Sequence, residues 1–279
     1  MDDLLRIPVC TVADGHGPPP ARDNGGMEHA IDLNADLGES YGAWRMGDDA
    51  AMFEVVSSAN VACGFHAGDP LTMHRSARLA VRHGVVLGAH PGYRDRAGFG
   101  RRALDVSAEE LAAEVVYQLG ALAAVARAAG TEVRYVKAHG ALYHRLGADR
   151  SAAAATAAAL VAAAPGIVVL GPPESEFERA AAEAGIRYAR EAFIDRGYLP
   201  DGRLVPRDHP DALVEDPMRA ADRALELVET GGIAAADGAR VELAPDSLCL
   251  HGDTPGSVGI ARAVRAALAE AGHDVRPFA

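Results

Sequence analysis

Histidines, carboxylates and a lysine recur in this sequence where short apolar runs end. Residues 31–39 alternate apolar residues with Asp32, Asn34 and Asp36 before reaching Glu39, and a period of two predicts a strand. Because burying an unpaired carboxylate is costly, this strand either has a solvated face or directs its polar side chains into a site. Later apolar runs end in a similar way, at His66, His90, Lys137, His139, Glu191 and His251.

Residues of these types could carry acid–base or metal chemistry if they converge on one site. Aspartate, glutamate and histidine act as general acids and bases, and aspartate and histidine also bind divalent metal ions. The sequence contains no His-Glu-x-x-His motif and no paired cysteines, so both kinds of chemistry stay open. We predict that the catalytic residues are Asp36, Glu39, His66, His90, Lys137 and His139, with Asp36, His66 and His90 as candidate metal ligands.

Positive side chains among these groups indicate an anionic ligand. Lys137 could hold a carboxylate or a phosphate, or stabilise an oxyanion, and Arg207 is one of several arginines that could do the same. The sequence has neither a P-loop nor a dinucleotide-binding fingerprint, so any nucleotide would bind without these motifs. The residues predicted to bind substrate are Asn34, Arg101, Glu191, Asp195, Arg196 and His251.

Several other reactive residues fit structural roles. Cys63 and Cys249 are interpreted as small buried residues, which is the usual role of a free cysteine in an apolar run. Asp69 precedes Pro70 and is typical of a helix cap, whereas Asp253 fits a cap or a site equally well. The other histidines are interpreted as structural or surface groups: His16, His29, His74, His83, His144, His209 and His273.

Apolar runs and helix caps alternate along the chain, which indicates parallel βα units. Strands are predicted at residues 31–36, 60–64, 85–90, 133–139, 167–170, 188–195 and 247–251. Helices are predicted at residues 48–57, 70–83, from 107, 151–164, from 175, 217–231 and from 254. We expect one α/β domain over residues 28–279, after a flexible, turn-rich extension at 1–27. It is either a closed (β/α) barrel of about seven strands or an open doubly wound sheet, and in both the polar strand ends meet on one side.

Composition limits the classes of partner. The chain has 279 residues, 49% of them hydrophobic, and a net charge of −12; nucleic-acid-binding proteins normally carry a basic patch instead. Its three cysteines are widely spaced, which favours a reducing compartment over a disulfide framework. No signal-peptide pattern and no apolar run of about 18 residues is present. We therefore expect a cytoplasmic protein that binds a small molecule, without nucleic-acid or membrane partners.

A series of motifs resembles the LamB/YcsF family, in order from about residue 29 to 273. They are Asp32-Leu-Asn-Ala-Asp-Leu-Gly-Glu39, Ser58-Ala-Asn-Val-Ala-Cys-Gly-Phe-His-Ala-Gly-Asp69, Gly88-Ala-His-Pro-Gly92, Gly98-Phe-Gly-Arg101, Val136-Lys-Ala-His-Gly-Ala-Leu-Tyr143, Glu191-Ala-Phe-Ile-Asp-Arg-Gly-Tyr198, Leu204-Val-Pro-Arg207 and Cys249-Leu-His-Gly-Asp253. Two departures are visible. Ala138 stands where the family usually has proline, and the stretch before Met27 is outside the family pattern.

The resemblance implies a fold, an activity and partners. The implied fold is a seven-stranded (β/α) barrel of the glycoside hydrolase/deacetylase type. Members of the family form the A component of 5-oxoprolinase, so the implied reaction is ATP-dependent opening of 5-oxo-L-proline to L-glutamate. ATP, expected with Mg, would be the co-substrate, and 5-oxoprolinase subunits B and C would be the partners.

The residues are compatible with that chemistry. A lactam is a resonance-stabilised amide, so water attacks it slowly. Its ring also recloses readily, because the amine is tethered to the carboxyl group. Coupling to ATP overcomes both the slow attack and the reclosure. In this hypothesis Lys137, with Arg101 or Arg196, holds the carboxylate or phosphate, while the carboxylates and histidines activate water or position a metal. Two alternatives stay open: a stand-alone metal-dependent amide hydrolase or deacetylase of the same barrel superfamily, and a non-catalytic component that presents substrate.

Overall fold

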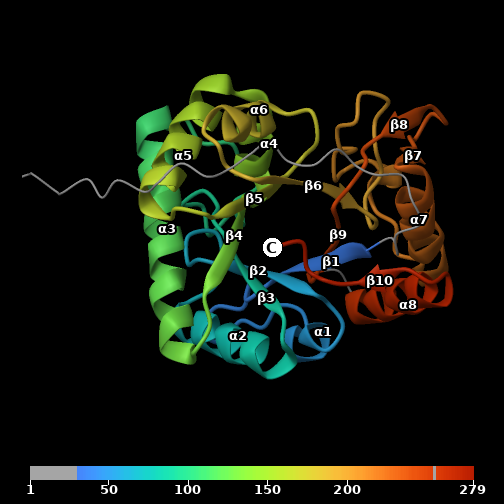
Figure 1. The fold of residues 1–279 in the computed structure, drawn as a ribbon, viewed down its shortest axis with the longest axis horizontal. Coiled ribbons are helices and arrows are strands. Elements are labelled where there is room, and N and C mark those ends of the chain that lie inside the picture. The colour runs from blue at the N-terminus through green and yellow to red at the C-terminus, as the bar shows by residue number, and fades with distance from the viewer. Residues whose placement is uncertain (1–29, 254–255) are drawn as a thin grey trace, which may run out of the picture.

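Seven parallel strands close on themselves because the first strand pairs with both the second and the last. The computed structural model describes residues 30–253 and 256–279, and Figure 1 shows its strands as a ring enclosed by helices. The order around the ring is β1-β2-β3-β4-β5-β6-β9, and the β1–β9 pairing, which sets Asp36 beside His251, completes it. The barrel prediction is thus confirmed and the open sheet is excluded. The strands are β1 (Ala30–Leu37), β2 (Ser58–Ala62), β3 (Val86–His90), β4 (Val133–Lys137), β5 (Val168–Gly171), β6 (Tyr188–Phe193) and β9 (Ser247–His251).

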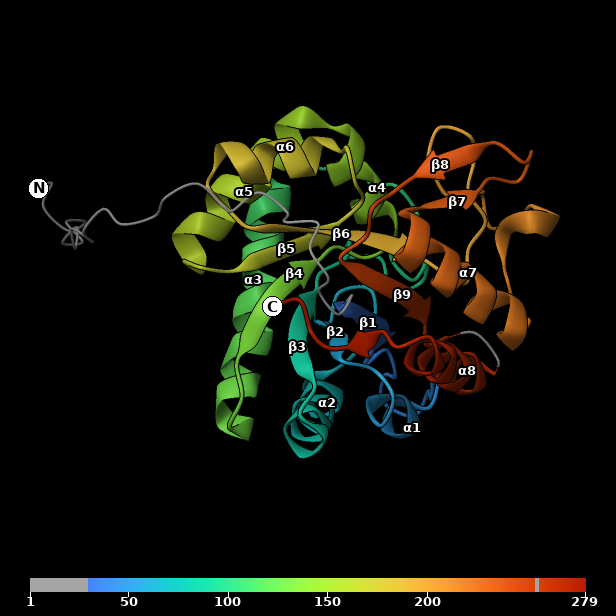
Figure 2. The same ribbon diagram turned by 45° about the vertical axis from the view of Figure 1, so that its right-hand side comes forward.

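Helices cover the outside of the barrel, and several begin at the caps that the sequence predicts. The side chains of Asp69, Ser107, Ser175 and Asp216 each accept a hydrogen bond from the backbone N–H three residues later, which satisfies a donor left free in the first turn. Figures 1 and 2 show α3 and α5 on one side and α7 and α8 on the opposite side. The helices are α1 (Asp49–Phe53), α2 (Pro70–His83), α3 (Ala108–Ala129), α4 (Gly140–Ala148), α5 (Arg150–Ala163), α6 (Glu176–Glu183), α7 (Pro217–Thr230) and α8 (Ser257–Glu270).

Among the described residues, α3 alone is long and apolar enough to match a membrane span by length and composition. Its residues Leu111, Val115, Leu119 and Leu122 are buried and belong to the main hydrophobic core. A buried stripe at three- and four-residue steps is typical of a helix packed on a globular core. The apolar character of α3 is therefore accounted for by its packing on the barrel.

The alternation in β1 separates two buried layers rather than a buried face from a solvated one. Leu33 and Ala35 belong to the hydrophobic core between strands and helices. Asp32, Asn34 and Asp36 contact side chains of other barrel strands across the interior. Because Asp32 is 0% exposed, the solvated-face alternative for this strand is wrong. The barrel interior is polar, and its carboxylates must be satisfied by other side chains.

The amino-terminal end of the barrel is closed by the end of the chain. The short strand β10 (Asp274–Val275) pairs in parallel with β1, and Figure 1 shows the C-terminus in the middle of the strand ring. The Phe278 ring packs against Tyr135, with centroids 4.9 Å apart, and the Phe278 carbonyl accepts a hydrogen bond from Arg187. Ligand access is therefore expected at the opposite, carboxyl end of the strands.

Some predicted boundaries are wrong, mostly where elements are short. Helix α1 ends at Phe53 and β2 begins at Ser58, two residues before the predicted start. Helix α4 was not predicted, because its N-cap His139 forms no side-chain cap hydrogen bond. The hairpin of β7 (Gly232–Ala234) and β8 (Arg240–Glu242) was also missed, since three-residue strands are too short for alternation to show. The predicted extension at 1–27 and helix start at 254 lie outside the described residues.

The carboxylate of Asp32 is fully buried in the barrel. Its Oδ1 accepts hydrogen bonds from Ser57 Oγ at 2.7 Å and Ser58 Oγ at 2.6 Å, and its Oδ2 accepts one from Ser247 Oγ. Burial outweighs these bonds and raises the pKa of Asp32 from 3.8 to about 6. Between these two pH values the folded chain holds a proton that the unfolded chain has released.

We expect Asp32→Asn to change the pH dependence of stability in a defined direction. Since the folded state binds more protons in this window, the free energy of unfolding of the wild type should fall as pH rises from 4 to 7, by about 2–3 kcal/mol from this group. The variant lacks this titrating group. Its free energy of unfolding should therefore rise relative to that of the wild type by the same amount between pH 4 and 7. Urea unfolding at each pH measures it, and a pH-independent difference between the two proteins would contradict it.

Candidate functional site

A cavity of about 450 Å³ lies at the carboxyl end of the strands. Parallel α/β barrels form their sites at this end, because side chains from separate strands meet there. Most of the residues predicted from the sequence are brought together in or beside it. Those that line the cavity are Asp36, His90, Arg101, Lys137, His139, Arg196 and His251.

The ammonium group of Lys137 lies inside the barrel, with a side chain only 1% exposed. Its Nζ is 2.8 Å from both Asp36 Oδ1 and Glu191 Oε1. It also donates to Asn34 Oδ1 at 3.3 Å and to Cys249 Sγ at 2.9 Å. An ammonium has three protons, so these four neighbours use all of them. Lys137 therefore holds Asp36 in place; it also lines the cavity, and its role in binding a ligand anion stays a prediction.

The Asp36–Lys137 pair stays ionised despite its burial. Burial alone would raise the pKa of Asp36, but His90 and Lys137 outweigh it and hold that pKa well below its usual range. Burial would likewise lower the pKa of Lys137, and the Asp36 carboxylate, with Glu191, holds it well above its usual value. Asn60 Nδ2 donates a further hydrogen bond to Asp36 Oδ1 at 2.8 Å. Asp36 is thus a fixed negative charge on the cavity floor.

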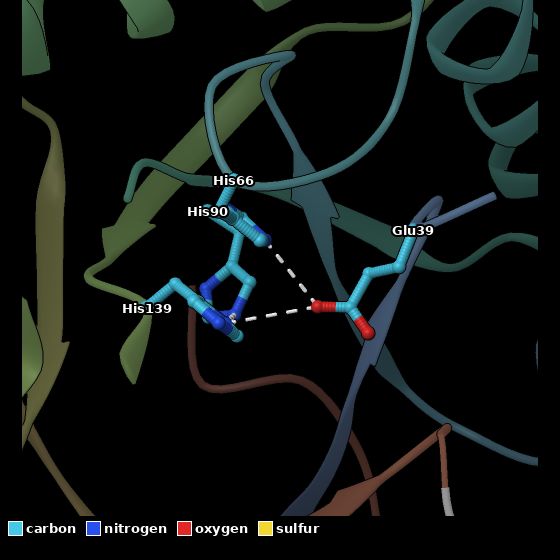
Figure 3. A group of neighbouring side chains, drawn as sticks. All are labelled: Glu39, His66, His90 and His139. Atoms are coloured by element: carbon cyan, nitrogen blue, oxygen red, sulfur yellow. Dashed lines mark hydrogen bonds and ion pairs between the residues drawn. The ribbon is translucent and has the colours of Figure 1, made fainter. Parts of the chain in front are cut away.

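Three imidazoles and a carboxyl group form a buried cluster beside this floor. Figure 3 shows Glu39 reaching towards His66, His90 and His139 from the opposite side. Glu39 Oε1 is 3.3 Å from His66 Nε2 and 3.7 Å from His139 Nδ1. The rings of His66 and His139 are stacked at 3.8 Å. Burial, followed by the repulsion of Asp36, raises the pKa of Glu39 well above its usual value.

Hydrogen bonds to backbone carbonyls fix two of the imidazole tautomers. His90 Nδ1 lies 2.8 Å from the Lys137 carbonyl and His139 Nε2 lies 2.8 Å from the Phe99 carbonyl. A carbonyl can only accept, so each of these nitrogens carries the ring proton. The other two nitrogens, His90 Nε2 and His139 Nδ1, then face each other 3.0 Å apart with their lone pairs. Ala138, in place of the proline usual in the resembling family, leaves these contacts intact.

Facing lone pairs need a proton or a cation between them. Burial is the main cause that lowers the pKa values of His66 and His139 far below the usual value, which disfavours the proton. One ligand atom from each of Glu39, His66, His90 and His139 lies within 4.8 Å of all the others. Carboxylate and imidazole ligands whose second nitrogen donates to a carbonyl are typical of divalent transition-metal sites. The cluster could therefore hold a metal ion.

This cluster overlaps the predicted ligand set only in part. His66 and His90 belong to it as predicted, and Glu39 and His139 join them. Asp36 lies outside this group of four, with Oδ1 bonded to Lys137 and Asn60 and Oδ2 3.3 Å from His90 Nε2, so its role as a metal ligand stays a prediction. Asp36 lies within β1 and Glu39 two residues after its end.

Arginines form the rim of the cavity. Arg101 Nη2 donates to Asp253 Oδ2 at 2.7 Å, which places the ambiguous Asp253 at the site. Arg196 donates from Nε and Nη2 to two backbone carbonyls, so only part of its guanidinium is available. Arg207 lines the cavity and makes no ion pair within residues 30–253 and 256–279. Arg207 is therefore available for an anionic ligand, and Arg101 lines the same cavity while paired with Asp253.

Three of the predicted substrate-binding residues lie behind the cavity wall. Asn34 and Glu191 contact the Nζ of Lys137 through their side-chain oxygens. Asp195 Oδ2 accepts hydrogen bonds from the backbone N–H and from Nδ1 of His251, each at 2.8 Å. These residues position Lys137 and His251 and do not line the cavity themselves.

Sequence reasoning missed several cavity residues, of which Tyr143 and His144 are polar, and one contact. His144, interpreted as structural, lines the cavity together with Tyr143; both lie on the first turns of α4, which was not predicted. Cys249 is buried as expected, yet its sulfur accepts a hydrogen bond from Lys137 Nζ. Cys63 fits its structural interpretation, since burial raises the pKa of its thiol to about 12. Asp69 fits its predicted role as a cap of α2.

Comparison with known proteins places this site in a family context. The model of the LamB/YcsF family matches residues 31–279. The chain is 56% identical to the A subunit of 5-oxoprolinase from Mycobacterium avium over 248 residues, which cover 89% of this chain and 98% of that protein. It is 54% identical to the corresponding 5-oxoprolinase A subunit of Kocuria rhizophila over 249 residues, 89% and 99% of the two chains. The crystal structure of a lactam utilization protein from Thermus thermophilus superimposes with a TM-score of 0.84, at 48% identity over 89% of this chain and all of that one.

Replacing Lys137 by methionine should destabilise the fold strongly. The change leaves Asp36 and Glu191 as unpaired buried carboxylates, and breaking a buried ion pair in this way costs about 3–5 kcal/mol. Adding Glu191→Gln removes one of these charges and should recover about 1–3 kcal/mol. Urea unfolding of wild type, both single variants and the double variant measures the coupling. Additive effects of the two substitutions would contradict the charge-balance account.

Proposed function

Because the chain belongs to the LamB/YcsF family, we propose that it is the A component of a 5-oxoprolinase and opens the lactam ring of 5-oxo-L-proline to L-glutamate. The observation that carries the proposal is the presence, in one cavity, of unprotonated imidazole nitrogens and of the guanidinium groups of Arg101 and Arg207. A lactam with a carboxylate needs both kinds of group. The relatives that share this chain over nearly their full length are named as the A subunits of 5-oxoprolinases.

In this proposal the rim binds the substrate and the floor activates water. Arg101 and Arg207 hold the carboxylate of 5-oxoproline, since guanidinium groups match carboxylates in geometry and charge. Without a metal ion in the cluster, His90 Nε2 or His139 Nδ1 takes the proton from the attacking water as a general base. Asp36, ionised next to His90 Nε2 at 3.3 Å, stabilises the imidazolium that forms.

Hydrolysis of a lactam also requires an energy source, because the tethered amine recloses the ring. Transfer of a phosphoryl group from ATP to the amide oxygen gives an activated imidate and ADP. Water then adds, the C–N bond breaks to free the amine, and a second water releases phosphate and L-glutamate. We assign the ATP-dependent step to a complex with subunits B and C, since this sequence carries no P-loop.

As the alternative use of the same lone pairs, we propose that the cluster of Glu39, His66, His90 and His139 holds a divalent transition metal, in which case His90 and His139 are ligands and not the general base. Such an ion would supply Lewis acidity and a bound water of lowered pKa when present. The facing lone pairs of His90 and His139 support this assignment. So does Glu39, whose pKa is raised by burial and by Asp36, because a neighbouring cation would favour its ionised form.

Reconstitution tests the activity. The purified chain mixed with subunits B and C, 5-oxoproline and ATP should release glutamate and phosphate. His90→Ala should lower kcat by about 10²–10⁴-fold, which is the usual contribution of a general base, while His83→Ala, exposed at the end of α2, should not. Release of glutamate without ATP would favour a stand-alone hydrolase, and no release in any combination would contradict the proposal.

Elemental analysis tests the metal independently of turnover. The purified chain, loaded with zinc and dialysed, should retain close to one ion, and Co²⁺ should give a visible absorption band. His139→Ala and Glu39→Gln should each weaken retention at least about tenfold, because the loss of even an outer partner of a ligand has effects of about 10–100-fold. His83→Ala is the matched control. Equal retention by all four proteins would place any bound metal elsewhere.

A further inference from the structure

Exposed aromatic and arginine side chains form a continuous strip beside the histidine cluster. The strip starts at a tight turn in which Tyr41 and Trp44 exchange backbone hydrogen bonds of 3.0 and 2.9 Å. Their rings stack with centroids 6.2 Å apart. The turn is tied to α2, because Gly42 N–H donates to the Asp69 carboxylate at 2.8 Å. The aromatic rings are therefore held in place without being buried.

Arginines continue the strip from this turn to α3. The Arg96 guanidinium lies 3.7 Å over the Tyr41 ring and donates to the Gly64 carbonyl. The Arg94 guanidinium lies 5.0 Å over Phe65, whose ring stacks on Tyr117 with centroids 5.5 Å apart. The strip is defined by Tyr41, Trp44, Phe65, Arg94, Arg96 and Tyr117.

The exposure of this strip is unusual for a free surface. Trp44 is 74% exposed and Tyr117 is 66% exposed. Tryptophan, tyrosine and arginine are the side chains that most often dominate the energy of protein–protein contacts. Their gathering on one rigid surface is typical of an interface core.

Local charge indicates what kind of partner fits. The chain carries a net charge of −12. Within the strip Arg94 is paired with Glu114, whereas Arg96 has no ion-pair partner in the described part of the chain. Arg45, next to Trp44, is exposed as well. A complementary surface therefore offers carboxylates around an apolar recess for Trp44, which is the chemistry of another protein rather than of a nucleic acid.

We propose that the strip docks another component of the same enzyme through an acidic surface with an apolar recess. The inference rests on the proposed function, because the A component of an enzyme presupposes other components. Position supports it: Tyr41 follows Glu39 by two residues and Phe65 directly precedes His66. A partner on the strip thus lies against the loops that hold the histidine cluster.

The only tryptophan of the sequence gives a direct probe. Trp44 is that residue, so the chain labelled with 5-fluorotryptophan should give one ¹⁹F resonance. Adding the unlabelled complex of subunits B and C should shift or broaden it. An unchanged resonance, or a change caused by RNA or anionic vesicles and not by the B–C complex, would overturn the inference.

Variants measure the energetic weight of the strip. Trp44→Ala should weaken binding of the B–C complex by about 30-fold and Arg96→Glu by about tenfold or more, the range of interface hot spots. Met218→Ala is the matched control, since Met218 is 67% exposed on α7, on the other side of the barrel from α3 (Figure 1). Unchanged affinity in both strip variants would overturn the proposal. Metal retention should stay unchanged in all three, which separates loss of docking from loss of folding.

The two proposals fail in different ways. If the wild-type complex releases glutamate while the Trp44 resonance stays sharp, the docking surface is wrong and the function stands. If the resonance broadens but no glutamate or phosphate forms, the docking surface stands and the proposed function is wrong.

Discussion

The buried ammonium of Lys137 is the group on which the barrel interior depends. An isolated charge in a protein interior is strongly unfavourable, so Lys137 requires Asp36 and Glu191, and each of them requires Lys137. These three residues come from β4, β1 and β6, which are not neighbours in the sheet. The charge balance therefore spans the barrel and can be met only when it closes. An apolar interior would lack this requirement and would leave Asp36 without a fixed position.

The same lysine connects the interior to the cavity through its backbone. The Lys137 carbonyl accepts a hydrogen bond from His90 Nδ1. The lone pair of His90 Nε2 is thereby directed towards His139 and Asp36. Side chain and main chain of one residue thus set the charge of the floor and the tautomer of a cluster imidazole. Replacing Lys137 removes the ammonium and keeps the carbonyl, so its first effect is on the charge of the floor and cannot be interpreted simply as loss of a substrate contact.

The fold and the location of the site follow from the sequence, whereas the division of roles does not. Alternation in residues 31–37 and the caps at Asp69 and Ser107 are local signals, and they predict elements that the structure confirms. The location of the site can be predicted because the carboxyl ends of parallel strands meet on one side of the barrel. The roles of Lys137 and Asp36 depend on contacts across the barrel with Glu191 and Asn60, which no local pattern encodes. His144 was missed for a related reason, since it lies on a short helix without a side-chain cap.

The cluster and the exposed strip share the loops that follow β1, β2 and β3. Glu39, His66 and Phe99 turn inwards from these loops, while Trp44, Phe65 and Arg96 turn outwards. The inner side is tightly packed, because a Cβ added at Gly100 would lie 2.7 Å from the Cβ of His66 and 3.0 Å from Cδ2 of His139. Interiors packed this closely transmit small displacements instead of absorbing them. Contacts made on the outer side of the loops therefore act on the same rigid unit that sets the geometry of the imidazoles, and the site cannot be treated as independent of whatever covers its rim.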